Sequence, residues 1–174
     1  DGRRRDLFNL TLYFEQQLSL ETSGDVKSAA VASNTLVRLG RDYDHNFLEY
    51  AGDYAACGFY EEAIGLMGLQ SREKSPMHYY YLGWFYQQNG DAETAARFFQ
   101  QAAEADPALC FPNRIEDVPV LQFAMEQNPR DAKAPYYLGC LWYDKRQYNE
   151  AIAMWEESLR RDDTFPTVHR NLGI

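Results

Sequence analysis

The fold is decided by residues 76–107, which read PMHYYYLGWFYQQNGDAETAARFFQQAAEADP. In the first half, Tyr79, Leu82 and Tyr86 recur at the spacing of one helix face. Asn89-Gly90 then predicts a helix end, because glycine readily adopts the left-handed backbone that closes a helix. The second half predicts another amphipathic helix, whose shared face carries Ala95, Phe99 and Ala102. The stretch therefore predicts two antiparallel helices joined by a short turn.

The same pattern recurs along the chain. A second copy preserves the spacing with Pro135, Leu138, Gly139, Trp142, Ala151, Trp155 and Ser158. A third copy begins at His169, and its Gly173 follows Gly139 by 34 residues. A weaker upstream copy has Ala51 in place of the glycine, 32 residues before Gly83. A period of this length indicates a repeat array in which stacked helix pairs share a continuous core.

This pattern resembles the tetratricopeptide repeat, most specifically in residues 76–109 and 132–165 and less so in 44–75. The departures are Tyr79 where the family usually has Trp, Pro135 at the same position of the second copy, and Ser158 in place of a small apolar residue. The resemblance implies an all-α, right-handed superhelical solenoid of antiparallel helix pairs. The pattern along the chain predicts about nine or ten helices.

The predicted organisation is a single helical repeat array over residues 1–174. Residues 1–43 form a degenerate repeat or cap, with Leu7, Leu10, Phe14 and Leu18 as one helix stripe and Asp25 capping a second helix. Repeats follow over 44–75, 76–109 and 132–165. Gly83 and Gly139 are 56 residues apart, which exceeds one period by 22. Residues 110–131 are therefore expected to be a linker plus one half-repeat helix, Asp117–Gln127.

The ends of the sequence suggest a segment of a larger protein. The chain begins with Asp1 rather than Met, and Ile174 falls inside what should be a first helix. We therefore expect self-association through this truncated C-terminal helix as one form of partnership. Residues 111–173 are also similar to repeat regions of large bacterial proteins of unknown function, some of which carry carbohydrate-related domains.

Composition excludes several classes of function. The 174 residues carry a formal net charge of −9, so the chain has the wrong sign to bind nucleic acid or an anionic membrane surface. The sequence contains no run of ~18 apolar residues, as a transmembrane helix would require. Its three cysteines are far apart, which favours free thiols in a reducing, cytoplasmic setting. We expect no metal site, because none of the three histidines has another His or Cys at ligand spacing.

No arrangement of residues indicates an enzyme or a cofactor. Adjacent acidic pairs such as Glu61-Glu62 do not face each other on a helix, so they cannot work as paired carboxylates. The cysteines lack a neighbouring base pattern, and no glycine-rich phosphate loop is present. We therefore expect no catalytic residues and no cofactor.

The best candidate for function is the concave face, formed by the first helix of each pair. The residues offset from its packing stripe are the predicted ligand-binding set: Met77, Tyr80, Trp84, Gln87, Lys133, Tyr136, Cys140 and Tyr143. The truncated copy adds Thr167, Arg170 and Ile174. Aromatic rings here would stack on an extended peptide or on a sugar. The alternative is that these rings belong to the core, as aromatic stripes usually do. The family's chaperone-binding carboxylate clamp is absent from the corresponding positions.

The sequence thus predicts a non-catalytic interaction or scaffold module of a larger protein, which binds a polypeptide or a neighbouring domain through its concave face. The alternative is an accessory repeat region of a carbohydrate-active bacterial protein, with an aromatic groove contacting glycan. A flanking catalytic domain would favour the second interpretation, and a flanking regulatory domain the first. An aromatic groove alone does not distinguish peptide from sugar.

Overall fold

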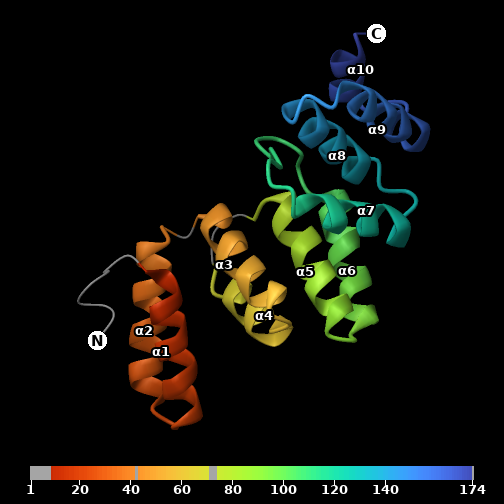
Figure 1. Ribbon diagram of the computed structural model, residues 1–174. Coiled ribbons are helices and arrows are strands. Elements are labelled where there is room, and N and C mark those ends of the chain that lie inside the picture. The colour runs from red at the N-terminus through yellow and green to blue at the C-terminus, as the bar shows by residue number, and fades with distance from the viewer. Residues whose placement is uncertain (1–8, 42, 71–73, 174) are drawn as a thin grey trace. The chain divides into compact units, whose positions relative to one another are not determined.

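The computed structural model describes residues 9–41, 43–70 and 74–173, and this part of the chain is helical with no strand (Figure 1). The helices within it are α1 (Leu10–Thr22), α2 (Val26–Leu39), α3 (Asp44–Ala56), α4 (Tyr60–Gly68), α5 (Pro76–Gln88), α6 (Ala92–Glu104), α7 (Asp117–Gln127), α8 (Lys133–Asp144), α9 (Tyr148–Arg161) and α10 (Pro166–Leu172). The predicted all-α fold of helix pairs is confirmed. Leu7 and Ile174, which the sequence placed in the first and last helices, lie outside the described residues.

Side-chain caps begin several helices where the sequence places them. Asp25 Oδ1 accepts from the Ser28 N–H at 3.1 Å, and Asp91 Oδ1 accepts from the Thr94 N–H at 3.0 Å. Ser75 caps α5 in the same way, ahead of Pro76. These bonds satisfy N–H groups that have no partner within the helix. Local sequence therefore contributes directly to where these helices begin.

Contacts gather into two compact units, Asp1–Glu73 and Lys74–Ile174. In the first unit, α1 packs on α2 and α3 on α4. Its largest buried side chains include Phe14 of the predicted stripe, Leu36, Phe47 and Met67. The N-terminal helices predicted from a weak pattern are therefore present. The repeat boundaries proposed from the sequence remain predictions.

The second unit contains the two best copies as the hairpins α5/α6 and α8/α9. A Cβ atom on Gly83 would lie 2.7 Å from the Phe99 ring, and one on Gly139 would lie 2.5 Å from the Trp155 ring. Such distances are shorter than carbon–carbon contacts allow, so each glycine makes room for the aromatic ring of its partner helix. This contact is the physical reason for the glycine in the repeated pattern.

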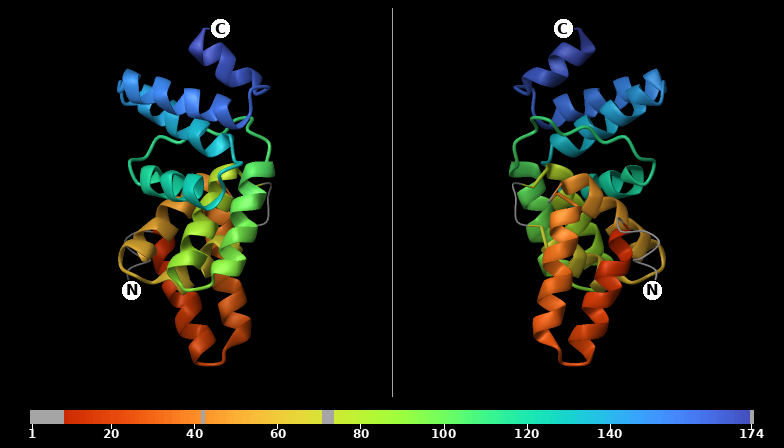
Figure 2. Two further views of the ribbon diagram at one scale, coloured as in Figure 1. Left: turned by 90° about the vertical axis from the view of Figure 1, so that its right-hand side faces the viewer. Right: turned by 90° about the vertical axis from the view of Figure 1, so that its left-hand side faces the viewer.

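The predicted half-repeat helix is α7, which packs against both α5 and α8. Figure 2 shows the irregular segment that precedes it leaving α6 and crossing to the start of α7. Two adjacent tyrosines of α5 secure this insertion. Tyr81 Oη donates to Asp117 Oδ1 and Tyr80 Oη donates to Asp131 Oδ2, each at 2.7 Å. One aspartate begins α7 and the other precedes α8, so α5 holds the insertion at both ends.

Candidate functional site

The structure separates the eight predicted ligand-binding residues by exposure. Three of them, Met77, Tyr80 and Tyr136, are buried. Only 7% of the Tyr136 side chain is exposed, which agrees with the alternative that its ring belongs to the core. Four are half-buried: Trp84, Gln87, Lys133 and Cys140. Tyr143 is the exposed member, at 56%.

The alternative core interpretation holds for Tyr80. Its ring meets the Tyr137 ring edge to face at a centroid distance of 6.1 Å, and its hydroxyl is held by Asp131. Burial and the neighbouring Asp131 carboxylate raise the pKa of the Tyr80 hydroxyl well above its usual value. Because Tyr80 is buried and bonded to Asp131 just before α8, its role in this structure is packing rather than ligand contact.

On the α5 face the insertion supports the core alternative. The half-repeat helix α7 packs on α5. The Trp84 ring meets Phe123 of α7 edge to face, with centroids 5.2 Å apart. Lys133 Nζ donates to the Ala105 carbonyl at 2.5 Å, which ties α8 to the turn after α6. Trp84 is therefore half-buried against α7, and Lys133 is already engaged within the chain.

Three predicted residues of α8 do line one cavity of about 320 Å³, which we call the α8–α10 groove. It takes residues from α8, α9, α10 and the segment before α7: Phe111, Tyr136, Cys140, Tyr143, Trp155, Arg170 and Asn171. The spacing along α8 placed Tyr136, Cys140 and Tyr143 on a common side, and Arg170 lines the same cavity. Three of the four predicted α8 residues and the predicted Arg170 thus line one cavity, to which α10 adds Asn171.

The groove contains one thiol, that of Cys140. Asn171 Nδ2 lies 3.8 Å from Cys140 Sγ. Burial raises the pKa of the Cys140 thiol, although the nearby Tyr136 hydroxyl and Asn171 amide act in the opposite direction. A thiol with a raised pKa stays protonated near neutral pH and reacts slowly. Cys140 therefore contributes a polarisable surface at the base of the groove.

Sequence reasoning missed Phe111, Trp155 and Asn171 as groove residues. Phe111 is 74% exposed, although Cys110 and Pro112 on either side of it are buried. Because the segment is irregular, helical spacing gave no signal for its direction. Only the structure shows that burial alternates here, with Phe111 exposed between two buried residues. Trp155 was correctly assigned to helix packing, and its ring edge also reaches the groove.

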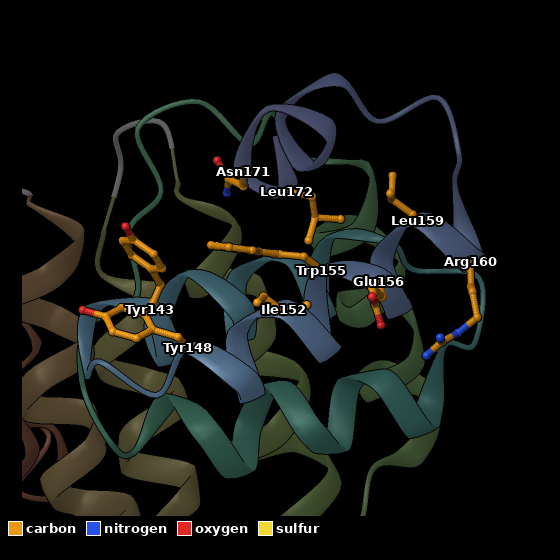
Figure 3. A pocket seen from close by; sticks show the side chains of 9 residues that line it. All are labelled: Tyr143, Tyr148, Ile152, Trp155, Glu156, Leu159, Arg160, Asn171 and Leu172. Carbon is orange, nitrogen blue, oxygen red and sulfur yellow. The ribbon is translucent and has the colours of Figure 1, made fainter. Parts of the chain in front are cut away.

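A second, larger cavity of about 780 Å³ lies along α9, and we call it the α9 groove (Figure 3). It shares Tyr143, Trp155 and Asn171 with the α8–α10 groove. The residues that belong to the α9 groove alone are Tyr148, Ile152, Glu156, Leu159, Arg160 and Leu172. Figure 3 shows the two tyrosines at one end and Arg160 at the other.

The described residues show no arrangement for metal-dependent chemistry, since no three of their His, Cys, Asp or Glu side chains gather at one place. Within the same residues, every helix is too short or too polar to cross a lipid bilayer.

No protein-family model matches the chain. Among solved structures it is similar to YrrB, described as a TPR (tetratricopeptide-repeat) protein with an unusual peptide-binding site, at 15% identity and a TM-score of 0.37, over 99% of this chain and 96% of that one. MamA is similar at 19% identity and a TM-score of 0.35, and the match covers 89% of this chain and 79% of MamA. The C-terminal part of a TPR repeat-containing protein from Cytophaga hutchinsonii is similar at 16% identity and a TM-score of 0.36. This match covers 90% of this chain and 67% of that one. At these identities, binding sites do not transfer.

Proposed function

We propose that this chain, a set of tetratricopeptide-like helix pairs, is a non-catalytic interaction module that binds an extended polypeptide in the α8–α10 groove. The observation that carries the proposal is the lining of that groove. Exposed rings, one guanidinium and one amide come together from separate elements around a concave surface. Ligand sites have this composition, with apolar area for affinity and a few polar groups for orientation.

The chemistry of the lining suits a peptide with an apolar residue beside an acidic one. Phe111 and Tyr143 offer ring surface to an apolar side chain. Arg170 is exposed at the same groove, and its guanidinium matches a carboxylate geometrically. Asn171 can bond to a peptide carbonyl or N–H, since its amide both donates and accepts.

The test begins by selecting peptides on the wild-type chain from a random display library and measuring their affinity by calorimetry. Phe111→Ala should weaken binding of the selected peptide about tenfold or more, because an exposed ring at a groove acts as an anchor. Leu109→Ala is the matched control: Leu109 belongs to the same segment and is 89% exposed, but it does not line the groove.

Equal affinities of the Phe111→Ala and Leu109→Ala variants would overturn the proposed site. Arg170→Gln should weaken peptides with an acidic residue more than neutral ones, because it removes only the charged partner. The glycan alternative enters as a further arm, in which a panel of oligosaccharides replaces the peptide. Binding of an oligosaccharide that Phe111→Ala abolishes, with no peptide selected, would assign the groove to sugars instead.

A further inference from the structure

The α9 groove adjoins the α8–α10 groove, because the two cavities have three lining residues in common. Tyr143, Trp155 and Asn171 belong to both. Tyr143 is exposed and Asn171 is half-buried, whereas Trp155 is only 4% exposed and lies beneath them as packing. A chain that leaves the α8–α10 groove past Tyr143 and Asn171 therefore enters the α9 groove.

The lining of the α9 groove is apolar and carries no excess of charge. Ile152 is 44% exposed, and Leu159 and Leu172 are half-buried at the same cavity. Its charged members are Glu156 and Arg160, one of each sign. Such a surface favours uncharged, apolar side chains over a partner of either sign, because an apolar lining cannot replace the water around a charged group.

The length of the α9 groove indicates how much of a ligand it can hold. Tyr148 and Arg160 line opposite ends and lie twelve positions apart on α9 (Figure 3). A helix rises about 1.5 Å per residue, which makes this length about 18 Å. An extended chain advances about 3.3 Å per residue, so about five residues span the groove. The α8–α10 groove is less than half as large, at about 320 Å³ against about 780 Å³.

We propose that the α9 groove is the second part of the peptide site, so that a polypeptide held in the α8–α10 groove continues past Tyr143 and places about five further residues along α9. Apolar side chains of this continuation pack on Ile152 and Leu172. The Asn171 amide borders both grooves and can bond to the peptide backbone where it crosses. The inference rests on the proposed function and adds to it the composition of the ligand: an acidic–apolar pair joined to a short apolar stretch without charge.

The experiment combines substitution of the groove with shortening of the peptide. The peptide is one selected on the wild-type chain, and calorimetry measures its affinity. Ile152→Asp should weaken binding of the full peptide about tenfold, because it places a carboxylate on the apolar surface. Ala153→Asp is the matched control and should bind as the wild type does, since Ala153 is exposed on the same helix outside the groove. Far-UV circular dichroism checks that both variants are as helical as the wild type.

Peptides shortened from either end supply the second arm. Removing residues from one of the two ends should weaken binding to the wild type about tenfold, because the α9 groove is then empty. That shortened peptide should bind Ile152→Asp and the wild type equally, since it no longer reaches the substituted surface. Phe111→Ala should weaken both the full and the shortened peptide.

Equal affinity of the full peptide for Ile152→Asp and the wild type, with Phe111→Ala still weakening it, would overturn the continuation and leave the proposed function standing. A loss with Ile152→Asp and none with Phe111→Ala would overturn both, because the peptide then occupies the α9 groove alone. Sedimentation velocity tests a different occupant. Self-association of the wild-type chain that Ile152→Asp abolishes and Ala153→Asp does not would assign the α9 groove to a second copy instead.

Discussion

At the scale of single residues, the repeated glycine is explained by the aromatic ring packed on it. Gly83 and Gly139 each face a ring of the partner helix, whereas Gly65 on α4 has no atom within 4 Å of an added Cβ. The same residue type thus has opposite consequences at different positions. Where a ring occupies the space, glycine is required; where the space is open, glycine only lowers helix propensity.

Gly83→Ala should therefore destabilise the chain by about 1–3 kcal/mol, because the new methyl group forces the Phe99 ring off its packing position. Gly65→Ala should stabilise it by about 0.5–1 kcal/mol, since it improves helix propensity without a clash. Chemical denaturation of both variants measures the difference. If Gly83→Ala is neutral or stabilising, the close contact between α5 and α6 is refuted.

At the scale of secondary-structure elements, the inserted helix α7 depends on buried side-chain hydrogen bonds. Asp117 Oδ2 accepts from the Asn113 and Arg114 N–H groups at 3.1 and 3.0 Å, while Oδ1 accepts from Tyr81. Burial raises the pKa of the Asp117 carboxyl, and these hydrogen bonds oppose the rise. The Tyr81 hydroxyl is therefore a required partner for a carboxyl group that water barely reaches.

Tyr81→Phe should cost about 1.5–3 kcal/mol of stability, because it leaves the buried Asp117 carboxyl short of a donor. Tyr79→Phe is the matched control two residues earlier, where no described residue receives a hydrogen bond from the hydroxyl. Its midpoint in denaturant should stay within error of the wild type. Equal losses for both variants would show that the Tyr81–Asp117 bond contributes nothing specific.

The sequence predicted these elements well where periodicity was strong. It placed a helix at Asp117–Gln127, where the structure has α7, and it identified the cap at Asp91. It left the α5 rings open between groove and core, because spacing along one helix does not reveal which other helix packs on it. The hydrogen bond from Tyr80 to Asp131 joins residues 51 positions apart, so helical spacing could not predict it. Of the candidate groove, only the α8 residues and Arg170 followed from spacing.

At the scale of the whole molecule, the chain consists of two compact units, and the second contains every part of both candidate grooves. The contacts that join the helix hairpins of the second unit are all between residues of that unit. These include Trp84 with Phe123, and Tyr136 with Phe165 of the turn before α10. Such a unit has its own core and meets the requirement for independent folding.

A fragment of residues 74–174 should therefore fold alone and unfold in one cooperative transition, because its core and its buried hydrogen bonds are internal. Far-UV circular dichroism during denaturation measures this. Introducing Gly83→Ala into the fragment should lower its stability as it does in the full chain. A fragment with little helix, or with gradual melting, would show that residues 1–73 are needed to hold it together.

The two tyrosine–aspartate bonds have a consequence for how the protein opens. Adjacent residues of α5 hold the start of α7 and the start of α8, so α7 cannot detach from its neighbours without exposing a buried carboxylate at one end. Local fluctuations that release α7 alone should be rare. Amide protons of α7 should therefore exchange with solvent as slowly as those of α5, in one cooperative opening. The inserted helix would then be as slow to open as the repeat that precedes it.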